Sequence, residues 1–335
     1  MSQKLSLVGE ALTGSLSAVA ANAVVFPLDV VAARLQVQSK ALAALKQRDA
    51  SGGEGKDRAY TSQLDALVRI AREEGIANGL FAGMAVSLTQ TAASAFLYFL
   101  FYAFVRRAYV RVLDRRAGKI GMRPSTTAEL TLGAIAGALS RAVTNPISVI
   151  STRLQTAASS TTAISVVKDV VDSDGILGLW RGFPASLILT VNPSITYGLF
   201  ERVKGLILAH RAKHIGTTVA KVALGPTETF LVGAFTKALA TIVTYPYILA
   251  KIRMQWRPPK SQNEEKSQIS AESKMLQDAV NYKSAQDVLV KVFQTEGLIG
   301  WYAGLNAQLL KAVLCQGILF LTKDYFTALG LLLFK

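Results

Sequence analysis

The chain has 335 residues, of which 51% are hydrophobic, with a mean hydropathy of +0.33 and a formal net charge of +15. This hydropathy argues against a soluble enzyme, and one Cys and two His exclude a disulfide framework and argue against a metal site. The basic residues cluster at the ends of apolar stretches, which argues against nucleic-acid binding and favours contact with anionic lipid headgroups or an anionic solute.

Six apolar stretches are predicted to cross a membrane, two in each third of the chain. A span needs about 20 predominantly apolar residues. In chain order the stretches are Ala11–Leu28, Gly75–Val105, Leu130–Thr152, Gly182–Phe200, Leu239–Ala250 and Gly297–Thr322. Single cations interrupt the third and sixth stretches at Arg141 and Lys311, and Lys237 precedes the fifth.

A proline-started motif closes the first, third and fifth stretches. Each copy has an Arg seven residues after the proline and a Gln nine residues after it (27 to 34 and 27 to 36 in the first copy). The copies are Pro27 with Arg34 and Gln36, Pro146 with Arg153 and Gln155, and Pro246 with Arg253 and Gln255. A repeat on this scale indicates an architecture built from three similar units.

A second signature follows each proline motif. It combines an acid–Gly pair, an aromatic residue and a final Gly, at 74–83, 174–182 and 296–304. A short amphipathic helix is predicted before it, with apolar faces at Leu64, Leu67, Val68 and Ala71, at Ile164, Val167, Val170 and Val171, and at Ala285, Val288, Leu289 and Val292. The chain 1–335 is therefore predicted to be one domain with repeats 5–120, 125–215 and 223–335 and flexible loops 37–60 and 256–282.

Three ordered copies of both signatures resemble the mitochondrial carrier family across essentially the whole chain. The resemblance implies an all-α membrane protein with six transmembrane helices in three pseudo-threefold repeats, each with a short surface helix. It also implies a monomer that is no enzyme and transports a solute by alternating access. Three segments, 191–195, 240–246 and 304–310, are similar to the peroxisomal adenine-nucleotide branch. This implies a multi-pass peroxisomal membrane protein, with the mitochondrial inner membrane as the alternative.

The family pattern also implies two gates. At the inner gate, the acid of one repeat pairs with the base of the next. Here the acid positions hold Asp29, Ser148 and Ile248, and the base positions hold Ala32, Ser151 and Lys251. No complete ion pair is expected, and Gln36, Gln155 and Gln255 are predicted to brace this layer. The outer gate is predicted at Arg106, Glu201, Lys204 and Asp324, with Asp324 and Arg106 as its one charged pair. Both barriers are therefore predicted to be weak.

Cations inside spans are costly and usually functional. Arg141, Lys237 and Lys311 are predicted to lie at similar depths and to bind phosphate, with Gln90, Ile188 and Leu189 at the remaining contact positions. Ile188 and Leu189 would suit a flat base such as adenine, and Asn22 and Tyr98 would supply hydrogen bonds. The alternative is that these cations extend to the interface or pair with helix carbonyls.

The predicted function is exchange of adenine nucleotides, ATP against AMP or ADP, without a cofactor. Larger adenine cofactors such as CoA, FAD or NAD use the same chemistry and stay open as alternatives. A non-transporting membrane scaffold is the alternative from another class, although it would have no need for intramembrane cations. An enzyme is disfavoured because no phosphate-cradling glycine loop is present and no His lies near the serines.

Overall fold

The computed structural model describes residues 7–38, 60–117, 124–157, 161–215, 224–256, 282–315 and 318, and the ordered elements in these ranges are helical. The long helices are α1 (Leu7–Val37), α4 (Met84–Ala117), α5 (Thr126–Thr156), α8 (Asn192–Ile215) and α9 (Pro226–Gln255). The short elements are α3 (Gln63–Glu73), η2 (Ile76–Leu80), α6 (Ala163–Asp174), η3 (Ile176–Trp180), α7 (Phe183–Ile188), η4 (Leu189–Val191), α11 (Ala285–Gly300) and a last segment, Leu305–Cys315.

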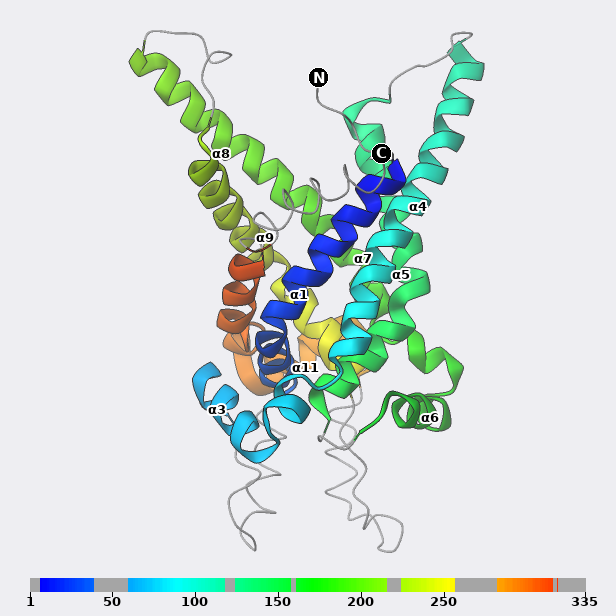
Figure 1. Ribbon diagram of the computed structural model, residues 1–335, viewed down its shortest axis with the longest axis vertical. Coiled ribbons are helices and arrows are strands. Elements are labelled where there is room, and N and C mark those ends of the chain that lie inside the picture. The colour runs from blue at the N-terminus through cyan, green and yellow to red at the C-terminus, as the bar shows by residue number, and fades with distance from the viewer. Residues whose placement is uncertain are drawn as a thin grey trace, which may run out of the picture.

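The helices follow one order three times. A long helix is succeeded by a short amphipathic helix and then by a second membrane-directed helix: α1, α3 and α4, then α5, α6 and α7–η4–α8, then α9, α11 and Leu305–Cys315. In Figure 1 the long helices converge at the lower end, with α3 and α6 outside the bundle, while α4 and α8 spread apart at the upper end. Apart from residues at their ends, the predicted loops 37–60 and 256–282 lie outside the described residues.

Length and composition alone identify fewer spans than the repeat pattern. Three described segments are long and apolar enough to cross a membrane, namely Val19–Val37, Ile76–Arg115 and Thr227–Gln255. A fourth results if α11 and Leu305–Cys315, which are bent by 74° relative to each other, form one broken span. Helix α5 and the interrupted α7–η4–α8 do not meet this criterion, although each occupies the place of a span in its repeat.

The short helices pack through faces that the sequence predicted only in part. In α11 the buried residues include Ala285, Val288 and Val292, as predicted. In α3, by contrast, Ala66 and Ile70 are buried, whereas Leu64 is 75% exposed. Helix α6 likewise buries Val166 and Val170 and exposes Ile164. The predicted face was therefore displaced by part of a turn in two of the three copies, because several apolar residues lie around these short helices.

The three proline-containing helices meet at the lower end of the bundle. Pro27, Pro146 and Pro246 lie inside α1, α5 and α9, where each removes one backbone N–H and displaces the carbonyl one turn earlier. These three helices contact one another pairwise. Their last turns are buried, which brings the Arg and Gln positions of the three repeats together.

These positions form a cyclic set of hydrogen bonds, called here the Arg–Gln ring. The Arg Nε of each repeat donates to the backbone carbonyl of the Gln in the next repeat. The distances are 3.1 Å from Arg34 to Gln155, 3.2 Å from Arg153 to Gln255, and 2.9 Å from Arg253 to Gln36. The guanidinium groups thereby satisfy carbonyls at the ends of helices that have no intrahelical partner. Each repeat is fixed to its neighbour, and the last is fixed to the first.

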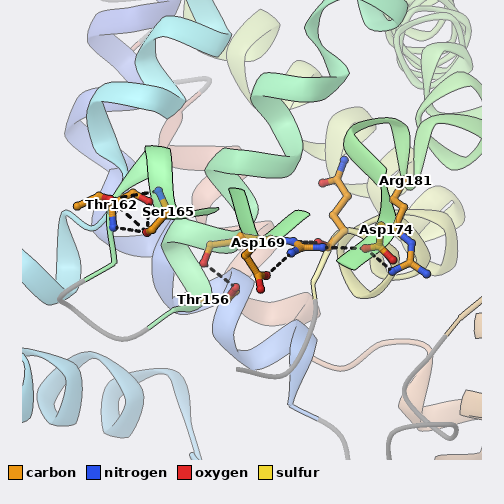
Figure 2. Close-up of polar contacts among 8 residues, drawn as sticks. Thr156, Thr162, Ser165, Asp169, Asp174 and Arg181 are labelled. Atoms are coloured by element: carbon orange, nitrogen blue, oxygen red, sulfur yellow. Dashed lines mark hydrogen bonds and ion pairs between the residues drawn. The ribbon is translucent and has the colours of Figure 1, made fainter. Parts of the chain in front are cut away.

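Each ring arginine also binds an acid of its own repeat. The acids belong to the acid–Gly pairs, with N–O distances of 2.8 Å for Arg34–Glu74, 3.4 Å for Arg153–Asp174 and 2.9 Å for Arg253–Glu296. In the second repeat Asp169 also accepts from Arg153, and Arg181 binds Asp174 at 3.1 Å. Figure 2 shows Asp174 beside Arg181, and Thr162 with Ser165 at the start of α6. The ring therefore anchors the surface helices as well as the spans.

The final glycine of each second signature packs against the next repeat. Gly83, Gly182 and Gly304 have φ values of +75°, +74° and +78°. A Cβ at Gly83 would lie 2.7 Å from Leu154 Cβ, and a Cβ at Gly182 or Gly304 would lie 3.1 Å from the Cγ of Gln255 or Gln36. Both the backbone conformation and the close approach require glycine. These contacts follow the same cyclic order as the Arg–Gln ring.

Candidate functional site

A cavity of about 460 Å³ lies among α1, α4, α5, α9, η4 and Leu305–Cys315. This volume falls in the range of roughly 300–1,000 Å³ that is usual for ligand pockets. Its lining includes four charged side chains, Asp29, Arg141, Lys251 and Lys311, among polar and apolar groups. The charged set comes from four separate elements, so only the folded bundle brings it together.

Two of the three cations have no counter-ion among the residues that the structure describes. Within the described residues, Arg141 and Lys251 make no side-chain hydrogen bond or ion pair, although both line the cavity. Cations held away from bulk water are costly unless an anion or a hydrogen-bond acceptor compensates them. The cavity therefore presents an unbalanced positive charge that suits an anionic ligand.

The third cation is paired. Lys311 Nζ forms an ion pair with Asp29 Oδ1, and the side chains are 25% and 8% exposed. Asp29 occupies the acid position of the first proline motif, and the base position of the next repeat, with which the family pattern would pair it, holds Ser151. Lys311 was predicted as a substrate contact. The structure thus joins one predicted gate residue to one predicted binding residue.

Lys237 lies outside the lining of the cavity. Its Nζ donates to Asn192 Oδ1 at 3.2 Å, and Asn192 Nδ2 donates to Thr244 Oγ1 at 2.7 Å. These bonds join α9 to the first residue of α8, where the fourth span is interrupted by η4. The geometry assigns Lys237 a structural contact, and its predicted contact with substrate stays a prediction.

The remaining predicted contact residues divide into two groups. Asn22, Gln90 and Leu189 line the cavity, and Asn22 Nδ2 donates to Thr91 Oγ1 at 2.9 Å. Ile188 and Tyr98 are not in the lining. Ile188 is 44% exposed, and the Tyr98 ring stacks on Tyr102 with ring centres 6.2 Å apart.

All of the predicted inner-gate residues except Gln255 line the cavity. Ser148, Ser151, Gln36 and Gln155 line it together with Lys251, which the sequence analysis placed only in the gate. No charged pair within the described residues joins the acid and base positions of two proline motifs.

The three glutamine side chains differ in their contacts. Gln255 Oε1 accepts from Thr152 at 2.9 Å, and its Nε2 donates to Ser148 at 3.3 Å. Gln36 Nε2 donates to Tyr245 Oη at 3.1 Å, and Tyr245 in turn donates to the Ala303 carbonyl at 2.6 Å. Gln155 lines the cavity. The side-chain layer is therefore less regular than the backbone bonds of the Arg–Gln ring.

On the opposite side, the predicted gate residues find other partners. Arg106 Nε binds Glu129 at 2.9 Å, and Tyr102 also donates to this carboxylate. Glu201 and Lys204 pair within one turn of α8 at 3.3 Å, and Asp324 lies outside the described residues. Glu129 was missed by the sequence analysis, although an acid at the start of the third span was a visible candidate partner. These exposed pairs contribute about 0–1 kcal/mol each.

No group of three or more metal-binding side chains occurs within the described residues. The lining of the cavity supplies cations, amides and hydroxyls that suit an anionic ligand.

The repeat pattern is matched by a known protein family. The family model described as "Mitochondrial carrier protein" matches residues 3–113, 123–211 and 223–331. The chain belongs to the mitochondrial carrier family. This confirms the predicted fold class of six membrane-spanning helices in three repeats. The exact limits of the repeats predicted from the sequence stay a prediction.

Several named relatives cover almost the whole chain. It is 32% identical over 321 residues to "Peroxisomal adenine nucleotide transporter 1" of Saccharomyces cerevisiae, covering 92% of the chain and 88% of that protein. It is 28% identical over 344 residues to "Peroxisomal nicotinamide adenine dinucleotide carrier" of Arabidopsis thaliana, covering 93% of each. It is also 28% identical to "Peroxisomal membrane protein PMP34" of Mus musculus over 329 residues, or 95% and 92% of the two chains. The predicted resemblance to this branch is confirmed.

Proposed function

We propose that this carrier exchanges adenine nucleotides, ATP against AMP or ADP, across the peroxisomal membrane. The observation that supports this most directly is the cavity with Arg141, Lys251 and Lys311 in its lining and one carboxylate among them. The names of relatives at 32% identity support the same substrate class and membrane.

The cations and the apolar groups of the cavity would bind different parts of a nucleotide. Arg141 can bind phosphate oxygens through two N–H groups, whereas Lys251 and Lys311 act as point charges. Leu189, Ile248 and Ile252 also line the cavity and provide apolar surface for a purine. Gln90 and Asn22 offer amide groups that can bind ring nitrogens or ribose hydroxyls.

Alternating access requires the closed lower end to open. The Arg–Gln ring is the set of contacts that has to separate there, one at each junction between repeats. The predicted repeats 5–120, 125–215 and 223–335 would then move as units around the cavity within a single domain. Anionic headgroups would meet the basic residues at the ends of the spans, and one chain suffices to enclose the cavity, which supports a monomeric carrier.

A larger adenine cofactor is the second candidate substrate. A relative named as a carrier of nicotinamide adenine dinucleotide is 28% identical over 93% of the chain. CoA, FAD and NAD all carry phosphates that the same cations would bind. A non-transporting scaffold is disfavoured because it would have no use for the cavity cations Arg141 and Lys251, which have no partner among the described side chains.

The test is uptake of labelled ATP into liposomes that contain the purified full chain. The liposomes are preloaded with AMP, with CoA or with buffer alone. Rapid uptake against AMP and loss of that uptake in Lys311→Ala are expected. Lys168→Ala removes an exposed lysine from α6 and serves as the matched control, with unchanged uptake. Uptake only against CoA, or uptake unaffected by Lys311→Ala, would contradict the proposal.

A further inference from the structure

The proposed exchange of nucleotides does not by itself explain why Asp29 forms an ion pair with Lys311 in the cavity. Asp29 is the one carboxylate among the described residues that line the cavity, and it is held by one of the three cations there. The other two cations, Arg141 and Lys251, have no counter-ion within the described part of the chain. A ligand phosphate that uses all three cations must therefore either share Lys311 with Asp29 or displace Asp29 from it.

The surroundings of Asp29 make that displacement costly. The base positions of the second and third proline motifs face the cavity and hold Ser151 and Lys251. Of these two, only Ser151 belongs to the repeat that follows the one with Asp29, so the family pairing offers Asp29 no cation in place of Lys311. Asp29 is 8% exposed, so water compensates a released carboxylate only in part. A buried charge that loses its partner destabilises the protein strongly. The ligand must bring more charge to Lys311 than Asp29 does.

We propose that Asp29 is an internal competitor for Lys311 that sets a minimum charge for the transported anion. This inference rests on the proposed exchange of nucleotides. A singly charged anion gains no more from Lys311 than Asp29 already provides, whereas a phosphate chain offers several oxygens to Arg141, Lys251 and Lys311 together. Asp29 is then a specificity-determining residue that acts through Lys311, because it occupies the cation that a nucleotide phosphate would use.

The decisive variants are Asp29→Asn, which keeps the size of the side chain, and Asp29→Ser, which introduces the residue that the second repeat carries at this position. Glu73→Gln is the control, because it removes an exposed carboxylate that pairs with Arg69 on α3. Exchange in liposomes gives KM for AMP and ATP, and thermal shifts of the purified carrier with AMP, ATP, CoA or inorganic phosphate report binding without transport.

Removal of Asp29 is expected to tighten binding. KM for AMP should fall about tenfold and KM for ATP about threefold, because AMP has fewer oxygens with which to offset the carboxylate. In a Lys311→Gln background, where exchange is expected to be lost, Asp29→Asn should leave the thermal shift with AMP or ATP unchanged, since the two residues act as a unit. A structural role for Asp29 would lower the amount of folded carrier without producing this dependence on Lys311.

Three results would overturn the inference or separate it from the proposed function. A higher KM in both Asp29 variants would show that Asp29 helps the substrate to bind, and equal changes in the presence and absence of Lys311 would show that it acts elsewhere. If the unmodified carrier bound CoA and no nucleotide, the proposed function would fail, and the same cycle measured with CoA would still support or overturn the competition.

Discussion

The Arg–Gln ring and the charged layer of the cavity both include residues of the proline motifs, but only the ring uses the same side chains in all three repeats. In the ring, every repeat supplies the same Arg and the same Gln. In the cavity layer, the acid positions hold Asp29, Ser148 and Ile248, and Lys251 is the one cation at the base positions. The ring joins three similar neighbours in a cycle, so each junction needs the same donor and acceptor. The cavity receives one asymmetric solute, so each repeat can contribute a different side chain.

The largest effect is expected from breaking the ring. Arg253→Ala removes the partner of Glu296, a pair whose side chains are 2% and 7% exposed, together with the bond to the Gln36 carbonyl. The free energy of unfolding should fall by about 3–5 kcal/mol because a buried charge loses its partner. Thermal or denaturant unfolding in detergent measures this change. Lys204→Ala, which breaks an exposed pair in α8, should change it by less than about 1 kcal/mol. Equal losses would contradict the assigned role of the ring.

The cavity layer is expected to affect transport more than stability. Lys251→Gln removes a cation that has no counter-ion in the described ranges of the chain, and KM for ATP should rise about 10- to 100-fold, as for the loss of a hydrogen bond to a charged group. Lys237→Gln keeps an amide that can bind Asn192 and should change KM less than about threefold. Initial rates of exchange over a range of ATP concentrations decide between them. A larger effect at Lys237 would support the sequence prediction that it contacts the substrate.

The Arg–Gln ring and the charged layer of the cavity also differ in how far they could be predicted from the sequence. The proline motifs and acid–Gly pairs predicted the number and order of the helices, since each is a local pattern. The pairing of Asp29 with Lys311 joins α1 to the last described helical segment and has no local signature. Lys251 was placed in the gate by its motif position, and only the folded bundle shows that it lines the cavity. Leu64 was assigned to the wrong face of α3 because Ala66 and Ile70 fit a helical repeat equally well.

Substitutions at two glycines separate the effect of close packing between repeats from the effect of backbone conformation. Gly83→Ala introduces a side chain at φ +75° and places its Cβ 2.7 Å from Leu154 Cβ, whereas Gly75→Ala meets only the first of these penalties, at φ +84° with no atom within 4 Å. Gly83→Ala should therefore be less stable than Gly75→Ala by about 1–3 kcal/mol, the usual cost of overpacking. Unfolding of the two variants under the same conditions measures the difference. Equal stabilities would show that the contact between repeats adjusts freely.

The smallest effect is expected at the surface helices that the ring anchors. Thr162 caps α6, where its side chain accepts from Ser165 N at 3.3 Å and its N–H donates to Ser165 Oγ at 3.1 Å. Thr162→Ala should lower the free energy of unfolding by about 1 kcal/mol. Lys168→Ala, at an exposed position of the same helix, should stay within about 0.5 kcal/mol of the unmodified protein. Unfolding curves of both variants would show whether the cap matters.

Cys315 provides a natural labelling site inside the cavity. It is the one cysteine in the 335-residue chain, and its side chain lines the cavity beside Lys311. A thiol-reactive fluorophore therefore has one possible attachment point, and no cysteine has to be removed beforehand. Because the thiolate is the reacting form and reagent must enter the cavity to meet it, the rate of labelling measures how often the cavity is open and empty. Protection by a candidate solute would then rank substrates without a membrane or a gradient.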